Sequence, residues 1–295
     1  MKIGYFADGV WAHKALEKII NTKNLEISFI VPRYSRQDPI LKLWATKLGI
    51  DFLPMKNIND SKNIDKIKKY NTDLLVSMSF NQIFKKEILS INKLGAINCH
   101  AGALPFYRGR NSLNWALIND ESSFGVTVHY IDEGIDTGDI IAQHKQPIKD
   151  TDDYGSLLKK ATHLCSDLLC HSLNDILSNS TNRIKQIEID SVGSYYKKRK
   201  KGDENIDWTW NSRKLFNFVR SLNTPGPCAR SFISKNEIKI KKVAVVDFID
   251  GKFIHGEVIK KNNKIYIKTI DKFLELINYE TDNNFVLSEG DLFKI

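Results

Sequence analysis

The sequence predicts an α/β protein, in which a doubly wound, mostly parallel sheet is followed by a smaller C-terminal β-rich domain. Strand-like apolar runs alternate with amphipathic segments over the first hundred residues, the pattern of a parallel sheet with helices on its faces. The run at 73–78 is almost continuously apolar, typical of a strand covered on both sides. Beyond Tyr196 the pattern changes to short strand-like runs separated by Asn, Asp and Gly, which favours a small antiparallel sheet or barrel.

The apolar spacing assigns each element of the first domain in turn. Alternating or continuous apolar runs predict strands over 2–6, 25–31, 73–78 and 96–100. Apolar residues on one face predict helices over 10–20, 40–48 and 60–70, and a long amphipathic helix over 153–178 closes the domain.

The expected domain boundaries follow from the same change of pattern. We expect a first domain over 1–196, a linker over 197–205 and a second domain over 206–295. The second domain should contain a helix near 212–222 and strands over 229–233, 237–248, 253–259 and 264–270. No role is assigned to the last fifty or so residues.

Composition and charge limit the class of protein. With 295 residues and 42% hydrophobic content, the chain can bury a sizeable core. More than half of the net charge of +9 lies in one run, Lys197–Lys201, which we interpret as a solvated linker rather than a nucleic-acid surface. No window approaches the roughly 20 apolar residues of a membrane span, so we expect a cytoplasmic protein without a membrane partner. Because the four cysteines form no CxxC pair, we expect buried free thiols and no metal site.

The most informative stretch runs from Leu94 to Gln143. Asn98 and His100 alternate along a predicted strand end, so their side chains share one face, and a loop with Gly and Pro follows. A neutral amide beside an imidazole suits acyl transfer, because the amide can donate to a developing oxyanion while the imidazole accepts or positions a proton. Neither task needs a metal ion.

The motifs in this stretch resemble the folate-dependent formyltransferase family. Asn98-x-His100 precedes Leu104-Pro105 and Tyr107-Arg108-Gly109, and the turn Asp136-Thr-Gly-Asp139 follows in the family's order. The family includes glycinamide ribonucleotide, methionyl-tRNA and nucleotide-sugar formyltransferases. The resemblance implies a formyltransferase-type, Rossmann-like fold and a catalytic set of Asn98, His100 and Asp136. It covers about residues 1–235, fades after Ile240, and departs from the usual Ser-Leu-Leu-Pro loop at Gly102 and Ala103.

The resemblance also implies the formyl donor, N10-formyltetrahydrofolate. Its pterin would lie between the end of a strand and the loop from Asp132 to Asp139. The residues implied in this binding are Ser79, Phe80, Gln82, Ile83, Phe84, Asp132, Glu133 and Asp139.

The formyl acceptor is predicted from the loop that follows the catalytic strand. Its arginines can supply planar donors to a phosphate or pyrophosphate. The turn after the first strand has no GxGxxG, which disfavours a nicotinamide cofactor, but its amides could still meet a phosphate. The predicted substrate-binding residues are Asp8, Trp11, Tyr107, Arg108, Gly109, Arg110 and Asn111.

Two acceptors compete. Methionyl-tRNA formyltransferases carry a Gly/Lys-rich insertion after the second strand, whereas Pro32–Pro39 here runs almost directly into the next helix. The C-terminal domain is also close to neutral, and Tyr107–Asn111 resembles the nucleotide-sugar branch. We therefore expect a dTDP-, UDP- or GDP-linked amino-dideoxy sugar, typically 4-amino-4,6-dideoxy, as used in surface polysaccharides and lipopolysaccharide. Nucleic acid is not expected as a partner, and a homodimer is left open.

Other interpretations remain. The alternatives are a methionyl-tRNA formyltransferase, a formyl-folate hydrolase that uses water as acceptor, and a non-catalytic basic binding protein. Each motif also has a structural explanation, since an Asn or His at a strand end often caps a loop and Asp136–Asp139 is a common turn. Phe80 and Phe84 are as consistent with core aromatics as with a pterin pocket.

Overall fold

The computed structural model describes residues 1–282 and 285–294, and these fall into two compact units. The first unit comprises residues 1–110, 124–146 and 159–196. The second comprises residues 111–123, 147–158 and 197–295, so two internal segments group with the C-terminal part of the chain. Among the described residues, no helix is both long enough and apolar enough to cross a membrane.

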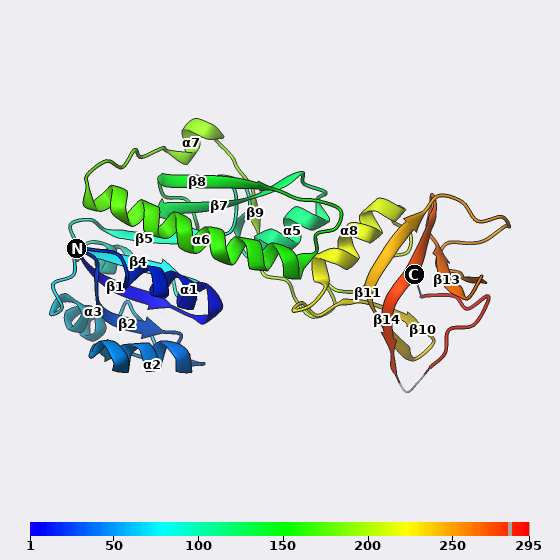
Figure 1. Ribbon diagram of the computed structural model, residues 1–295, viewed down its shortest axis with the longest axis horizontal. Coiled ribbons are helices and arrows are strands. Elements are labelled where there is room, and N and C mark those ends of the chain that lie inside the picture. Colours follow the sequence, from blue (N-terminus) through cyan, green and yellow to red (C-terminus); the bar gives the residue numbers. More distant parts are fainter. Residues whose placement is uncertain (283–284, 295) are drawn as a thin grey trace. The chain divides into compact units, whose positions relative to one another are not determined.

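The first unit is built on a seven-stranded sheet in the order β3-β2-β1-β4-β5-β7-β8 (Figure 1). Its first five strands in sequence pair in parallel, and β5 then pairs antiparallel with β7. The carboxyl ends of β1, β4 and β5 therefore lie along one edge of the sheet. The strands are β1 (Lys2–Ala7), β2 (Glu26–Pro32), β3 (Asp51–Phe52), β4 (Leu74–Met78), β5 (Ala96–His100), β7 (Ser123–Tyr130) and β8 (Ile140–Pro147).

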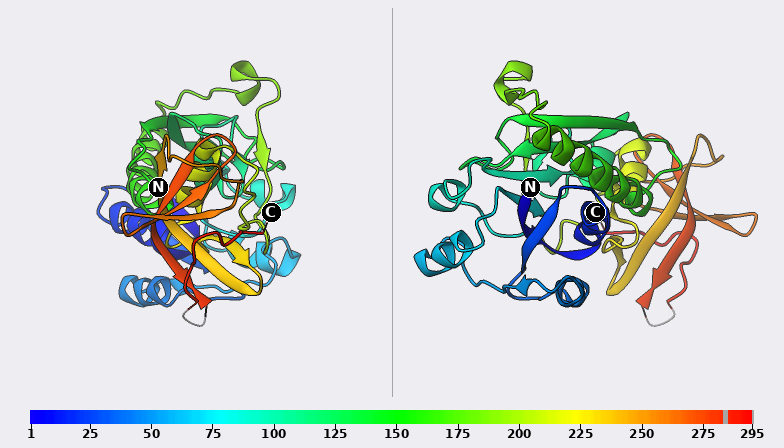
Figure 2. Two further views of the ribbon diagram at one scale, coloured as in Figure 1. Left: turned by 90° about the vertical axis from the view of Figure 1, so that its right-hand side faces the viewer. Right: turned by 60° about the vertical axis from the view of Figure 1, so that its left-hand side comes forward.

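Helices cover both faces of this sheet, as a doubly wound fold requires (Figures 1 and 2). Phe6 of β1 packs in a cluster with Ile64 and Ile67 of α3. Tyr5, the neighbouring residue on the opposite face, donates its hydroxyl hydrogen bond to the carbonyl of Ala12 in α1 at 2.9 Å. The helices are α1 (Gly9–Ile19), α2 (Pro39–Leu48), α3 (Ser61–Lys68), α4 (Lys86–Leu89) and α6 (Tyr154–Leu177). This arrangement confirms the predicted fold class.

Local sequence signals set the helix ends. Asp38 caps α2 by accepting hydrogen bonds from the amides of Ile40 and Leu41, and Pro39 fills the first turn, where no amide donor is needed. Gly49 ends the helix in the left-handed conformation at φ 64°. The predicted helix over 40–48 is thus confirmed.

A short strap, residues 183–196, crosses the loops at the end of β5. It contains α7 (Gln186–Ile189) and β9 (Tyr195–Tyr196), and β9 pairs in parallel with β6 (Arg108–Gly109). Neither of these two short strands was predicted.

The second unit holds a five-stranded antiparallel sheet in the order β10-β11-β14-β13-β12. Its core contains the fully buried Trp208, which stacks on Phe293. The prediction of a small antiparallel sheet is confirmed, but the strand expected over 253–259 begins only at Val258, and β14 was missed. The elements are α5 (Ser112–Ile118), α8 (Ser212–Leu222), β10 (Ala229–Ile233), β11 (Asn236–Val246), β12 (Val258–Lys261), β13 (Lys264–Lys268) and β14 (Phe273–Thr281).

Candidate active site

The end of β5 places Asn98 and His100 on one face of the sheet, as their alternation predicts. The antiparallel partner β7 brings His129 directly opposite Asn98. The Asn98 amide Nδ2 lies 3.2 Å from His129 Nε2. Because His129 Nδ1 lies 2.7 Å from the carbonyl oxygen of Tyr130, which can only accept, Nδ1 carries a hydrogen, and Nε2 is the ring nitrogen that faces Asn98.

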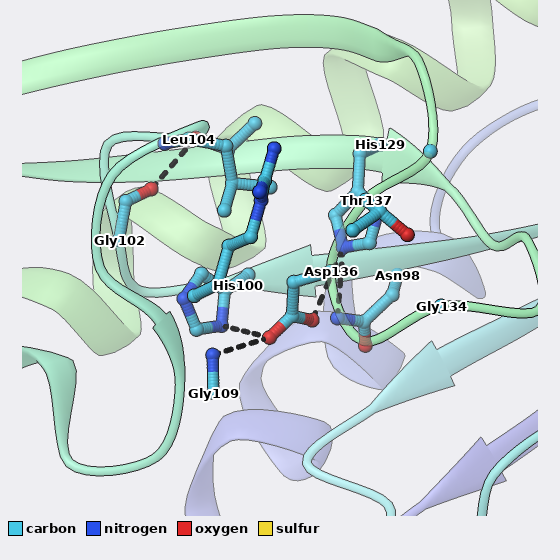
Figure 3. Close-up of polar contacts among 12 residues, drawn as sticks. Asn98, His100, Gly102, Leu104, Gly109, His129, Gly134, Asp136 and Thr137 are labelled. Atoms are coloured by element: carbon cyan, nitrogen blue, oxygen red, sulfur yellow. Dashed lines mark hydrogen bonds and ion pairs between the residues drawn. The ribbon is translucent and has the colours of Figure 1, made fainter. Parts of the chain in front are cut away.

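Asp136 reaches the same group from the turn between β7 and β8 (Figure 3). One carboxylate oxygen, Oδ2, is 3.7 Å from His100 Nδ1 and accepts a hydrogen bond of 2.9 Å from the amide of Gly109. The other, Oδ1, is 3.5 Å from His129 Nε2. The structure thus joins an amide, two imidazoles and one carboxylate at the predicted position.

The surroundings of Asp136 keep its carboxyl group ionised. Burial raises its pKa, but His100, His129 and the Gly109 amide together outweigh burial and hold the pKa well below the usual range. The backbone of Asp136 is in the left-handed region at φ 56°, uncommon for a residue other than glycine. Such a conformation persists only when the surroundings fix it, which is typical of functional sites.

His100 is oriented from its other ring nitrogen. Its Nε2 donates to the carbonyl oxygen of Tyr107 at 2.7 Å, so Nδ1 is the nitrogen that faces Asp136. A Cβ atom at Gly102 would lie 2.5 Å from this Nε2. Gly102 therefore leaves space for the imidazole in this orientation, and a side chain at this position would require the ring or the loop to shift.

His129 was missed in the sequence analysis. It occupies a position that only the pairing of β5 with β7 makes visible, because register between distant strands cannot be read from one sequence. Its signal was the alternating run Val126–Tyr130 just before the Asp136 turn.

The predicted acceptor-binding loop divides into groups with different partners. Arg108 donates from Nε and Nη2 to Gln186 Oε1 at 3.0 and 2.8 Å, and the Gly109 amide is occupied by Asp136. The ring of Tyr107 stacks on that of Tyr196, with 5.1 Å between the ring centroids. Arg110, in contrast, is exposed, and its guanidinium makes no ion pair or hydrogen bond with any residue that the structure describes.

The three remaining predicted substrate residues, Asp8, Trp11 and Asn111, have other surroundings than Tyr107, Arg108 and Arg110. Asp8 pairs with Arg33, with 3.3 Å between Oδ2 and Nε, and burial raises its pKa despite that partner. Trp11 is half-buried in the first turns of α1. Asn111 precedes α5 in the left-handed conformation and belongs to the second unit.

The segment predicted to hold the pterin consists partly of structural residues. Phe84 is buried against Phe6, and Phe80 is half-buried in the same cluster. The Gln82 side chain accepts from the amide of Ile58 and donates to the carbonyl of Met55, both at 2.9 Å. Ile83 is exposed, and Ser79, at φ 58°, offers its carbonyl to Arg33.

The loop after β7 has its own internal bonds. Asp132 Oδ1 accepts from the Thr137 hydroxyl at 2.6 Å and from the amide of Gly134 at 3.1 Å, which closes the turn before Asp136. The Asp139 carbonyl accepts from the amide of Tyr130, while Glu133 is exposed. Within residues 1–282 and 285–294, no three His, Cys, Asp or Glu side chains are grouped as metal ligands.

Comparison with known proteins decides the family. Residues 28–173 match the formyl transferase family, and residues 198–294 match the formyl transferase C-terminal domain. The chain is 31% identical over 303 residues to a methionyl-tRNA formyltransferase of Fusobacterium nucleatum, which covers 99% of this chain and 96% of the relative. The chain belongs to the formyl transferase family. The match of this formyltransferase to the family extends to residue 294, so the expectation that the resemblance fades after Ile240 was wrong.

Two further comparisons describe the formyltransferase's neighbours. It is 38% identical over 240 residues to the bifunctional polymyxin resistance protein ArnA of Wigglesworthia glossinidia brevipalpis, covering 81% of this chain and 36% of that protein. The sugar 3N-formyl transferase WlaRD, solved with dTDP and 5-N-formyl-THF, shares the fold with a TM-score of 0.69 at 24% identity, over 97% of this chain and 99% of the other. The predicted enzyme class, formyl transfer, is confirmed by family membership.

Proposed function

We propose that this formyltransferase moves the formyl group of N10-formyltetrahydrofolate to the amino group of a nucleotide-linked amino-dideoxy sugar. The observation that carries the chemistry is the convergence of Asn98, His100 and Asp136 at the end of β5. In this proposal the bond between the formyl carbon and the acceptor nitrogen forms, and the bond from that carbon to N10 breaks.

Each group has a role that follows from its bonding. The Asn98 amide donates to the formyl oxygen as negative charge develops there, exchanging its long contact with His129 for the oxyanion. His100 Nδ1 receives the proton that the attacking amine loses, and the ionised Asp136 stabilises the resulting imidazolium. The proton then passes to N10 as its bond to the formyl carbon breaks. His100 Nε2 stays on the Tyr107 carbonyl and fixes the ring, so we assign oxyanion stabilisation mainly to Asn98.

The donor-binding proposal is supported by the position of two segments. Phe80 follows β4, and Ile131 follows β7 and precedes the loop from Asp132. Both side chains pack against the same core cluster, so the two chain segments assigned to the pterin lie beside the same part of the core. The exposed side chain of Ile83 and the exposed turn from Asp132 offer apolar surface and backbone groups beside that cluster. These residues fit a flat, hydrogen-bonding heterocycle.

The acceptor proposal depends on Arg110. Its guanidinium is exposed on the loop whose neighbouring amide, that of Gly109, bonds Asp136. Because Arg108 is occupied by Gln186, we assign the contact with the sugar-linked phosphates to Arg110 alone. The short segment Pro32–Pro39 and the localised basic run also favour a small nucleotide sugar. The proposal is supported by the sugar 3N-formyl transferase WlaRD, which has the same fold and was solved in the presence of dTDP.

Methionyl-tRNA is the second candidate acceptor. It is favoured by the relatives, most of which carry the name methionyl-tRNA formyltransferase, including the Fusobacterium protein that aligns along nearly the whole chain.

The test is direct competition among acceptors. Purified protein is incubated with the formyl donor and, separately, with dTDP-, UDP- and GDP-linked 3-amino and 4-amino sugars and with methionyl-tRNA, and the formylated product is identified by mass spectrometry. We expect formylation of one nucleotide sugar, and efficient formylation of methionyl-tRNA alone would overturn the proposal. Arg110→Met should raise KM for the sugar about tenfold, since a hydrogen bond to a charged group contributes roughly 1.5–3 kcal/mol.

A further inference from the structure

Gln186 occupies a special place in the strap over residues 183–196. It is 3% exposed, although it is a polar residue on a four-residue helix whose neighbour Ile187 is 68% exposed. Its amide nitrogen donates to two carbonyl oxygens, those of Asp136 and Gly138, both at 2.8 Å. Its amide oxygen accepts both hydrogen bonds that Arg108 donates from Nε and Nη2.

This bonding connects Asp136 to its surroundings by two routes. The first route is direct, because the Gln186 amide holds the main chain of the turn that carries Asp136 in the left-handed conformation. The second runs through Arg108, whose neighbour Gly109 donates to Asp136 Oδ2. The strap also pairs with this dipeptide along the backbone, where Arg108 lies beside Tyr195 and Gly109 beside Tyr196.

We propose that Gln186 is a positioning residue, which fixes the Asp136 carboxylate against the Gly109 amide and the two imidazoles. The proposal rests on the catalytic role proposed for Asp136. A carboxamide suits the position because it donates two hydrogen bonds and accepts two at once, which neither a carboxylate nor a hydroxyl can do. A shift of about 1 Å in a catalytic group can cost 10²-fold in rate, so loss of this support should lower kcat.

The test compares Gln186→Met with a matched variant, Asn114→Leu. Methionine keeps the length of the glutamine side chain without its hydrogen bonds. Asn114 is also a buried amide that donates to a main-chain carbonyl, that of Ser221 at 2.6 Å, but it lies in the second unit and has no bond to the Asp136 turn. Both substitutions remove a buried amide, so their shared effects report general loss of stability.

Two readouts separate positioning from general stability. The first is the titration of the Asp136 carboxyl carbon by 13C NMR, assigned with Asp136→Asn. In Gln186→Met the pKa should rise toward the ordinary aspartate value of about 3.9, while Asn114→Leu should leave it low. The second is steady-state kinetics, in which Gln186→Met should lower kcat at least tenfold with KM changed less than threefold.

A second variant guards against a failure of Gln186→Met to fold. Gln186→Glu keeps the shape and the acceptor for Arg108 but loses both donors, and it should lower kcat to a similar extent. The proposal is wrong if, in both Gln186 variants, kcat and the Asp136 titration differ from the wild type by no more than they do in Asn114→Leu. The NMR titration needs no acceptor, so it tests Gln186 even if no nucleotide sugar is formylated.

Discussion

Two regions of the chain use polar groups in opposite ways: the end of β5 in the first unit and the core of the antiparallel sheet in the second. At the end of β5, the contacts among Asn98, His100, His129 and Asp136 are 3.2 to 3.7 Å long. In the second unit, the buried Trp208 stacks on Phe293 and donates to the Ser231 hydroxyl at 2.8 Å. Groups held by long contacts can exchange them for contacts with reactants, whereas short buried contacts contribute stability. Changes in the first region should therefore lower the rate, and changes in the second should lower the stability.

The largest effect is expected from Asp136→Asn. The amide keeps the size of the carboxylate but lacks the charge that stabilises a protonated His100, so kcat should fall by about 10² to 10⁴, the range typical of general acid–base groups. The measurement is single-turnover formyl transfer, with circular dichroism as a control for folding. A folded variant with more than a tenth of the wild-type rate would remove Asp136 from the mechanism.

Asn98→Ala should follow closely, with a loss of about 10² to 10³ in kcat, as for removal of one oxyanion donor. Asn98→Asp is the matched control, since it keeps the shape but replaces the donor with an acceptor. Comparable losses in both variants would indicate the donor, while near-normal turnover in either would show that another group stabilises the oxyanion.

Trp208→Ala tests the second region and should lower the stability of the second unit. Large-to-small substitution of a buried aromatic residue costs roughly 3–5 kcal/mol, here with a lost stacking partner for Phe293. Chemical denaturation should show this loss, while kcat per folded molecule stays within about twofold, because the contacts of Trp208 are with residues of its own unit. A loss of kcat without a loss of stability would contradict the comparison.

The pH dependence of stability should distinguish the two regions more finely. The pKa of Asp136 is lower in the folded than in the unfolded state, so its ionised form stabilises the fold above about pH 4 to 5, and this contribution is lost as the pH falls toward the folded-state pKa. Between pH 6 and pH 3, wild-type stability should therefore fall more steeply than that of Asp136→Asn. Parallel denaturation curves at each pH would contradict this expectation.

The smallest effect is expected from Arg213→Met. Arg213 bridges Asp120 and Asp150 at 2.6 and 2.7 Å, but the side chains are 43–67% exposed. Exposed ion pairs typically contribute about 0–1 kcal/mol, and salt screens them. The loss in unfolding free energy should therefore stay below about 1 kcal/mol and shrink in high salt.

Much of the first unit could be predicted because its signals are local. The apolar runs gave β1, β2, β4 and β5, and the alternation of Asn98 and His100 gave their shared face. The second unit was less predictable, since β14 lies between β11 and β13 in the sheet and its apolar pattern is interrupted by Glu275, Asn278 and Glu280. The boundary error at Val258 concerns residues 253–257, which were predicted as the start of a strand but form irregular backbone with a turn at 255–256.

The site was predictable only where residues are close in sequence. The motif indicated Asn98, His100 and Asp136, but the convergence of these residues depends on β7 pairing with β5. His129 and Gln186 depend wholly on contacts between distant segments, and Gln186 stands 50 residues from Asp136. Arg108 and Arg110 look alike in the sequence, and only tertiary structure shows that one is occupied and the other is exposed.

Because the strap follows the other site residues in the sequence, it is synthesised after them, and this order has a consequence for activity. A nascent chain that ends before residue 183 already contains Asn98, His100, His129 and Asp136, yet it has no group to occupy the carbonyls of the Asp136 turn or the guanidinium of Arg108. The proposed reactive centre is therefore complete only when residues 183–196 have emerged and docked.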